Sequence, residues 1–474
     1  MKKISAVLLI AVLASGLVFA GFSGNAEVRF GGDLDKGTFG FIKESTNVTF
    51  NMDVLTAVGE AKGEGDIYAE IKGSLKLYLT NGEKGGASMS DPTTIVMSAN
   101  GNSLGLQAKI ESAKIMGKDW YVGILSVPSV PDFAKSAVDT YTIEKQHDKL
   151  GWEKKDQDKN ATYSVAYKKA PGVEVGVAGY KFGVGLLGKV GEGDDFKTVA
   201  KNTEATLYVS TPDYALADGM TLTVAAVASQ KTIDSVRAFG GSAKFAVKTD
   251  SVKASVATDI GYNVLGVDKQ KFGADVALNV AFAPVTVDAY YATRAKTGEK
   301  PNATDPKKTD SSYTKNLVSA KVVADLNTYE VPVKLTVTGK DLIAKQDLSL
   351  AAEIGVMKGL TVTAKGGYVI ANNGRTGEDP TEFNNVTLRK GKWSAGADVK
   401  YAAEKFTVKA GASVSQVKDA EMQVKGNASV ETTAIIPGAT LKLAWAGDDL
   451  TQKIAGDHDN GNLGAVYAGC KIAF

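Results

Sequence analysis

The sequence predicts an all-β protein: a large antiparallel transmembrane β-barrel with short periplasmic turns and longer external loops. Three observations carry this prediction. Apolar and polar residues alternate with a period of two along most of the chain, the connections between these stretches are short and long in turn, and charged residues gather on one face of the predicted strands. Bacterial barrels of this kind have an even number of strands, and we expect between about 20 and 24, with about 22 as the best match.

The alternation is clear between residues 271 and 282. Phe272, Val276 and Phe282 fall on one face, while Asp275 falls on the other, because successive side chains of an extended strand point to opposite sides. Parallel strands would be apolar on both faces, so the pattern favours antiparallel pairing. In the C-terminal half the pattern predicts strands at 236–247, 251–262, 271–282, 285–293, 315–326, 329–338, 346–356, 360–371, 392–402, 405–414, 421–431, 439–446 and 464–474.

The connections between these strands alternate in length. The short ones fall at 248–250, 283–284, 327–328, 357–359 and 403–404, and the longer ones at 263–270, 294–314, 339–345, 372–391, 415–420 and 447–463. Only the connection at 432–438 does not fit this alternation of short and long connections. Outer-membrane barrels have short turns at the periplasmic end and long loops outside, so the pattern assigns the two ends of the barrel and places Phe474 at the short-turn end.

The chain before residue 236 is less regular. The alternation of short turns and long loops continues into this region if 173–189 is one long strand. The strand count becomes even only if 37–43 adds a strand to residues 26–31 or if 26–31 lies outside the wall. We expect residues 21–474 to form a single barrel, with the alternative that part of the region before about residue 160 is periplasmic.

Two features interrupt the pattern. Residues 127–159 contain Pro128, Pro131 and a charged run with mixed spacing, and they form either a segment folded into the lumen or a solvated external excursion. Pro332 falls inside the predicted strand 329–338, where it has no N–H for the ladder, and it therefore predicts a bulge.

Residues 1–20 have the features of a secretory signal peptide. Lys2 and Lys3 precede an apolar run, and Val18, Phe19 and Ala20 form a small-residue site, so we expect cleavage after Ala20 and export to the outer membrane. No later stretch offers the roughly 18 apolar residues of a membrane helix. Outer-membrane lipid is therefore the partner that the predicted strands would contact.

The charge balance excludes other partners. Lysine and arginine number 55 against 53 aspartates and glutamates, which gives no field for gathering nucleic acid or acidic substrates. The same balance predicts weak ion selectivity. Cys470 is the only cysteine, so the chain has no intramolecular disulfide.

Signals of enzyme chemistry are nearly absent. His147 and His458 fall in predicted loops without further ligands at metal-binding spacing, and the glycines at 183, 185 and 188 match a dinucleotide fingerprint that opens no helix. Asp457 lies in a loop that lacks the glutamate of a full calcium site. We therefore expect no catalytic residue, no cofactor and no bound metal.

The polar face of the strands suggests a different chemistry. Charges on a sheet face are unfavourable unless they are wet or paired, and with about 16 or more strands a barrel interior no longer fills with side chains. This predicts a water-filled channel. The candidate pore-lining residues are Lys72, Lys76, Lys109, Glu111, Lys271, Asp275, Asp288, Lys321, Asp325, Lys365, Asp398, Lys400 and Lys442.

The last strand has a distinct pattern. Tyr467, Gly469, Ile472 and Phe474 have a spacing that resembles the terminal assembly signal of bacterial outer-membrane barrels. A barrel's last strand pairs with its first, because closure leaves no exposed edge. We expect these four residues to engage the barrel assembly machinery, although the last strand of a soluble sheet would show similar alternation.

The glycine- and alanine-rich alternating strands, the segment 119–132 and the aromatic terminus together resemble the major outer sheath proteins of treponemes, a spirochaete family. The likeness is architectural and covers the full length. It implies a pore-forming surface protein that is often oligomeric and adheres to host extracellular-matrix proteins. Accounts of that family place the N-terminal part in the periplasm in some cases.

Three functions remain open from the sequence. A porin for passive diffusion of ions and small hydrophilic solutes accounts for the wet face and the loop asymmetry. A surface adhesin is compatible with it and would bind through loops 294–314 and 372–391. A surface-layer structural β protein without channel activity would show the same alternation.

Overall fold

The computed structural model describes residues 21–35, 37–42, 46–57, 67–79, 86–91, 94–98, 104–124, 133–138, 172–187, 204–230, 237–263, 272–293, 297–301, 309–312, 317–340, 342–343, 346–370, 392–416, 422–447, 450 and 463–474. Nearly all of them lie in β-strands, as predicted. No helix in this part of the chain has both the length and the apolar content to cross a bilayer.

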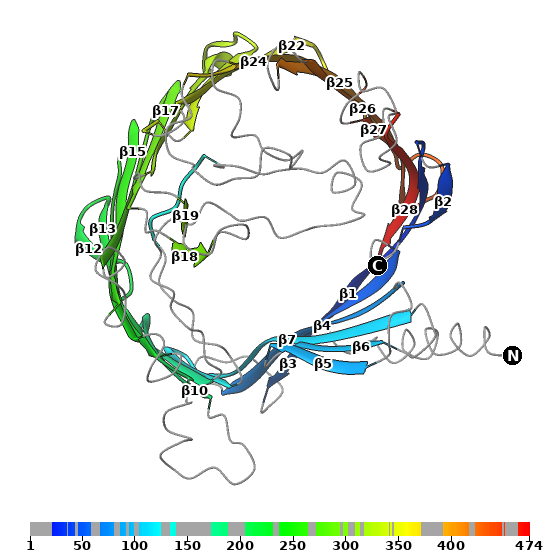
Figure 1. Ribbon diagram of the computed structural model, residues 1–474. Helices are drawn as coiled ribbons and strands as arrows, with labels where there is room; N and C mark the ends of the chain where they lie inside the picture. Colours follow the sequence, from blue (N-terminus) through cyan, green and yellow to red (C-terminus); the bar gives the residue numbers. More distant parts are fainter. Residues whose placement is uncertain are drawn as a thin grey trace, which may run out of the picture.

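The strands form one closed antiparallel barrel of 22 wall strands, which confirms the predicted fold (Figure 1). The wall consists of β1 (Gly21–Asp33), β3 (Asn47–Ala57), β4 (Tyr68–Leu79), β7 (Leu104–Met116), β8 (Trp120–Ile124), β9 (Gly172–Val177), β10 (Tyr180–Leu187), β11 (Glu204–Ser210), β13 (Met220–Gln230), β14 (Arg237–Lys248), β15 (Val252–Asn263), β16 (Phe272–Phe282), β17 (Val285–Ala292), β20 (Leu317–Asp325), β21 (Val333–Lys340), β22 (Asp347–Met357), β23 (Leu360–Val369), β24 (Lys392–Ala402), β25 (Phe406–Gln416), β26 (Met422–Thr432), β27 (Ala439–Gly447) and β28 (Ala465–Ala473).

Short elements lie beside this wall. β2 (Thr38–Phe41) pairs with β1, β12 (Tyr214–Ala217) pairs with β13, and β5 (Gly86–Asp91) and β6 (Thr94–Ser98) form a hairpin that pairs with β7. β18 (Thr297–Pro301) and β19 (Thr309–Ser312) form a separate two-stranded sheet, which Figure 1 draws within the outline of the wall. The single 3₁₀ turn described is η3 (Leu326–Tyr329).

The barrel closes where the first strand meets the last. β1 pairs antiparallel with β28 from Asn25 opposite Ala473 to Asp33 opposite Ala465. Beyond the ladder, Gly24 and Phe474 exchange two backbone hydrogen bonds of 2.6 and 3.0 Å. The aromatic ring of Phe474 packs on Phe50 of β3, with ring centroids 5.7 Å apart. The terminal strand is therefore held on both of its edges, by β27 and by β1.

The two faces of the wall differ sharply in chemistry. Cross-strand partners share a face, so the registers divide every wall strand into two sets of positions. Among wall positions with described side chains, the face that carries Phe272, Val276, Leu278 and Phe282 has no aspartate, glutamate, lysine or arginine. All charged side chains that the structure describes in the wall strands lie on the opposite face, which is the arrangement that the alternation predicts.

Aromatic side chains lie on the apolar face near both ends of β16. At the long-loop end, Phe239, Tyr262 and Phe272 are cross-strand neighbours, and all three are exposed. Phe282 is exposed at the short-turn end of the same strand, β16. Ten residues at about 3.4 Å each span roughly 34 Å along the strand. With the usual tilt of about 40° this gives a band about 26 Å tall, close to the apolar height of a transmembrane barrel.

The turn between β9 and β10 corrects one prediction. Residues 173–189 do not form one long strand but a hairpin, whose two-residue loop has positive φ at Ala178 (48°) and Gly179 (84°). This combination suits the right-handed twist of paired strands. Continuous alternation across the loop hid the turn in the sequence. With this extra strand, and with β1 in the wall and β2 only appended to it, the strand count becomes even.

Pro332 corrects a second prediction. It does not form a bulge inside a strand, because β21 begins only at Val333, after the η3 turn. Pro332 supplies its carbonyl to the N–H of Gly355 at 2.8 Å. Because proline has no backbone N–H to donate, Pro332 lies just before the first residue of β21 and not within its hydrogen-bonded ladder.

Candidate channel lumen

A short luminal segment, residues 133–138, identifies the charged face as the inner one. Figure 1 draws it inside the barrel, and it is bound to the wall by hydrogen bonds. The carboxylate of Asp259 on β15 accepts the backbone N–H groups of Phe133 (3.0 Å) and Ala134 (2.8 Å). The hydroxyl of Ser136 lies 3.2 Å from that of Ser319 on β20. Of the two interpretations of 127–159, the one in which the chain enters the lumen therefore fits these six residues.

The luminal segment contacts the wall closely. Ala134, Val138 and Ser319 are buried, with exposed fractions of 3%, 5% and 0%. A cavity of about 130 Å³ lies between the segment and the wall. Its polar lining includes Lys135 of the segment and Lys244, Ser255, Asn279 and Asp288 of the wall.

The registers extend the inner face around the whole barrel. Its basic positions are Arg29, Lys72, Lys76, Lys109, Lys114, Lys181, Lys244, Lys248, Lys253, Lys321, Lys334, Lys340, Lys365, Lys392, Lys400, Lys409, Lys425, Lys442 and Lys471. Its acidic positions are Glu27, Asp33, Asp53, Glu70, Glu174, Glu204, Asp259, Asp275, Asp288, Asp325, Asp347, Glu353, Asp398 and Glu431. Among the positions whose side chains the structure describes, which leaves out Asp53, Glu204 and Lys392, basic positions outnumber acidic ones by eighteen to twelve.

Most of the predicted pore-lining residues occupy this face. The structure places Lys72, Lys76, Lys109, Asp275, Asp288, Lys321, Asp325, Lys365, Asp398, Lys400 and Lys442 there. Ile110 lies opposite Gly73 and Ser112 lies opposite Lys72, so Glu111 between them is the extra residue of a bulge. The side chain of Glu111 and the whole of Lys271 lie outside the described residues.

Several inner-face acids have local hydrogen-bond partners. The hydroxyl of Tyr290 donates to Asp275 at 3.0 Å, and the amide of Asn279 donates to Asp288 at 2.6 Å. Asp398 forms an ion pair with Lys365, and Glu70 forms one with Lys72 at 3.1 Å. Hydrogen bonds and ion pairs of this kind lower the free energy of a carboxylate held against a wall.

The N-terminal half of the inner face contains a buried carboxylate. Glu174 on β9 accepts hydrogen bonds from the hydroxyls of Tyr121 on β8 (2.5 Å) and Tyr208 on β11. Tyr208 and Glu174 both oppose Gly183 on the intervening strand, β10. Gly183 and its neighbour Gly185 thus lie inside a strand and not at a nucleotide-binding turn.

Gly176 provides the space for the Tyr121 ring, because a Cβ at position 176 would lie 2.1 Å from Cε1 of Tyr121. We expect Gly176→Ala to destabilise the barrel by about 1–3 kcal/mol, the usual effect of overpacking. Gly241→Ala is the matched control, since its Cβ would find no heavy atom nearer than 3.6 Å. The midpoint of urea unfolding, followed by heat-modifiable gel mobility, measures the difference. Equal midpoints for the two variants would contradict this packing.

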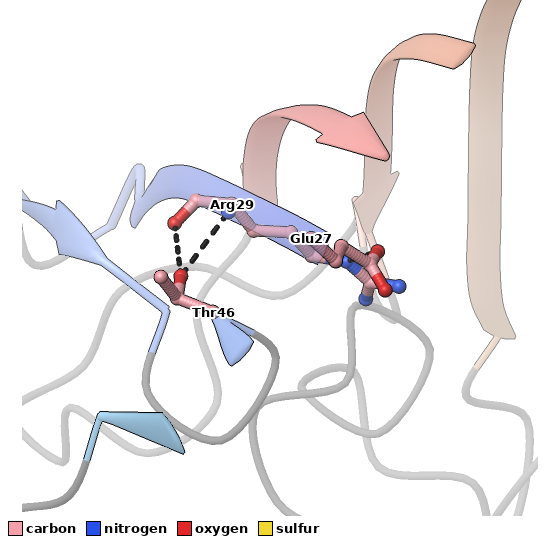
Figure 2. Close-up of polar contacts among 3 residues, drawn as sticks. All are labelled: Glu27, Arg29 and Thr46. Atoms are coloured by element: carbon pink, nitrogen blue, oxygen red, sulfur yellow. Dashed lines mark hydrogen bonds and ion pairs between the residues drawn. The ribbon is translucent and has the colours of Figure 1, made fainter. Parts of the chain in front are cut away.

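The closure seam adds a second polar cluster on the inner face. Figure 2 shows the hydroxyl of Thr46 beside the backbone of Arg29, where it accepts the N–H at 3.1 Å and donates to the carbonyl at 3.2 Å. Arg29 lies in the interval between the parts of β1 that pair with β3 and with β2. Thr46 therefore replaces a missing ladder partner at this interval.

The Arg29 side chain joins the seam to the last strand. It forms an ion pair of 2.5 Å with Glu27, and its guanidinium lies 5.1 Å from the ring centroid of Tyr467. Tyr467 is buried in a cluster with Ile42, Ala444 and Ala465. Of the four residues predicted as an assembly signal, Tyr467 and Gly469 lie on the inner face, while Ile472 and Phe474 are exposed on the outer one.

Other predicted features give no site in the described chain. His147, His458 and Asp457 lie outside the described residues, and no group of three or more potential metal-ligating side chains occurs within them. The predicted adhesion loop 372–391 also lies outside them. Of the second predicted adhesion loop, 294–314, the structure describes β18 and β19, which pair with each other. Host adhesion stays a prediction from the resemblance.

Comparison with known proteins gives a likeness in overall shape alone. No protein-family model and no curated protein matches the chain. Among solved structures, a mutant of the ferric enterobactin receptor PfeA from Pseudomonas aeruginosa is similar with a TM-score of 0.42 and 10% identity over 96% of this chain and 80% of that one. OccAB4 from Acinetobacter baumannii gives 0.35 and 8% over 96% and 97%.

The outer membrane protein OprD from Pseudomonas aeruginosa is similar with a TM-score of 0.32 and 10% identity over 96% of this chain and 93% of that one. These scores and identities are too low to transfer a solute, a partner or a mechanism from those proteins to this chain.

Proposed function

We propose that this protein is an outer-membrane porin that lets ions and small hydrophilic solutes diffuse through a water-filled lumen. The single observation that carries the proposal is the division of charge between the two faces of a closed barrel. An outer face without charges can contact hydrocarbon at no desolvation penalty, whereas charged side chains on the inner face need water or partners.

The size of the barrel supports a channel. With 22 strands spaced about 4.8 Å apart and tilted about 40°, the backbone ring has a diameter of roughly 44 Å. Side chains cannot fill a ring of this width. The luminal segment on β15 and β20 narrows the lumen on that side.

The proposal predicts stepwise conductance when the purified full-length protein is added to a planar bilayer. It also predicts heat-modifiable mobility in detergent gels, because a closed ladder of hydrogen bonds resists detergent until it is boiled. Protein that shows the mobility shift but gives no conductance steps would contradict a porin and favour a structural barrel. Protein that stays soluble without detergent would contradict the outer-membrane location as well.

A further inference from the structure

We infer that the lumen favours small anions over cations, and that the luminal segment contributes to this preference; the inference rests on the proposed channel function. The whole chain is almost neutral, with 55 basic and 53 acidic residues. The described inner face is not neutral, because its basic positions outnumber its acidic ones. A permeating ion passes the inner face, so the charge of this face decides selectivity.

The acids of the inner face are more enclosed than the lysines. Asp275 and Glu174 are buried, with exposed fractions of 9% each, and both accept tyrosine hydroxyls. Asp259 accepts two N–H groups of the luminal segment. These hydrogen bonds occupy acceptor sites of the carboxylates, so fewer of their oxygens are open to a permeating cation.

Four inner-face lysines, by contrast, form two exposed cross-strand pairs. Lys248 lies directly opposite Lys253, and Lys400 lies directly opposite Lys409. All four side chains are exposed. Like charges in directly opposed cross-strand positions are destabilising, and water and mobile counter-ions are what reduce the repulsion. Such pairs attract anions to the wall.

The luminal segment strengthens the positive side. Its docking covers Asp259, which faces a second carboxylate, Asp275, across the β15–β16 ladder. In return the segment presents Lys135, which lines the same cavity of about 130 Å³ as Lys244 of β14. One carboxylate, Asp288, is among the lining residues. The segment therefore adds Lys135 to the part of the lumen that Lys244 and Asp288 line, and its backbone N–H groups occupy the carboxylate of Asp259.

The preference must depend on salt. A Debye length of about 10 Å at 0.1 M leaves the centre of so wide a lumen screened, whereas about 30 Å at 0.01 M spans it. We expect an anion-to-cation permeability ratio above one for potassium chloride at about 0.1 M, and a ratio severalfold larger at about 0.01 M.

The test is the reversal potential of the full-length protein in a potassium chloride gradient. Lys135→Glu and Lys244→Glu are expected to lower the permeability ratio of the native channel at least twofold. Lys358→Glu, in the short turn between β22 and β23, makes the same change of charge outside the lumen and is expected to leave the ratio unchanged.

The outcomes separate the two proposals. A channel whose anion-to-cation permeability ratio is one or less would overturn the inference and leave the proposed porin function intact. A ratio above one that falls equally in all three variants would overturn the role of the luminal segment. Failure to form any conductance step would overturn the porin function, and the inference with it.

Discussion

Val276→Arg is expected to lower the yield of barrel inserted into a bilayer severalfold. Val276 lies near the middle of β16, between Phe272 and Phe282 at the two ends of the strand, and its side chain is 37% exposed on the outer face. An arginine at the midplane of a barrel's lipid face costs about 2–4 kcal/mol. Because total stabilities are only about 5–15 kcal/mol, the loss is expected to lower the folded yield severalfold. Refolding into lipid vesicles, read by heat-modifiable mobility, measures it.

Asn279→Arg is the matched control for this substitution. Asn279 is three residues further along the same strand, at a similar depth, but it belongs to the inner face and lies beside Asp288. An arginine there can remain hydrated and can pair with the Asp288 carboxylate, so the variant is expected to refold almost as well as the native protein. Equal refolding of Val276→Arg and Asn279→Arg would mean that the outer face does not contact hydrocarbon.

Asp259→Ala is expected to release the luminal segment and raise the single-channel conductance. The two N–H groups that Asp259 accepts would lose a charged acceptor, and each such hydrogen bond contributes about 1.5–3 kcal/mol. Losing about 2.8 kcal/mol changes the ratio of docked to undocked segment about a hundredfold. The other described side-chain hydrogen bond between the segment and the wall is the single hydroxyl pair of Ser136 and Ser319. Single-channel recordings at high salt measure the effect, since screening there removes the influence of the changed charge.

Asp398→Ala separates release of the segment from loss of charge. Asp398 lies on the inner face of β24 and pairs with Lys365, away from the segment. Its removal changes the wall charge by the same amount, and the conductance at high salt is expected to stay at the native value. If Asp259→Ala also leaves the conductance unchanged, the docked segment does not limit the flow of ions.

Much of the barrel could be predicted from the sequence because the outer face of every wall strand is apolar, so apolar residues recur at every second position. In the wall strands from β14 to β28 the apolar residues at alternate positions lie on the outer face, and the predicted bounds agree with the observed ones to within a few residues; β18 and β19, by contrast, fall in the predicted loop 294–314. The exceptions have local causes. Alternation continues through Ala178 and Gly179, which hides a two-residue turn. The apolar residues on both sides of Pro332 continue the strand pattern, although β21 begins only at Val333.

The contents of the lumen could not be predicted in the same way. Docking of residues 133–138 depends on Asp259 and Ser319, which lie 125 and 183 positions further along the chain from their partners. No periodic pattern encodes such a contact. The charge excess of the inner face, by contrast, was within reach, because it requires only that charges be counted at alternate strand positions instead of over the whole chain.

The most direct test of the central claim is a pair of neighbouring cysteines on β26. In a Cys470→Ser background, which removes the single native thiol, Ser429→Cys would place a thiol on the inner face and Val430→Cys would place one on the outer face. With the protein reconstituted in lipid vesicles, a bulky water-soluble maleimide is expected to label position 429 rapidly and position 430 at most slowly. Rapid labelling at 430 together with protection at 429 would contradict a barrel whose charged face encloses water and whose apolar face contacts lipid.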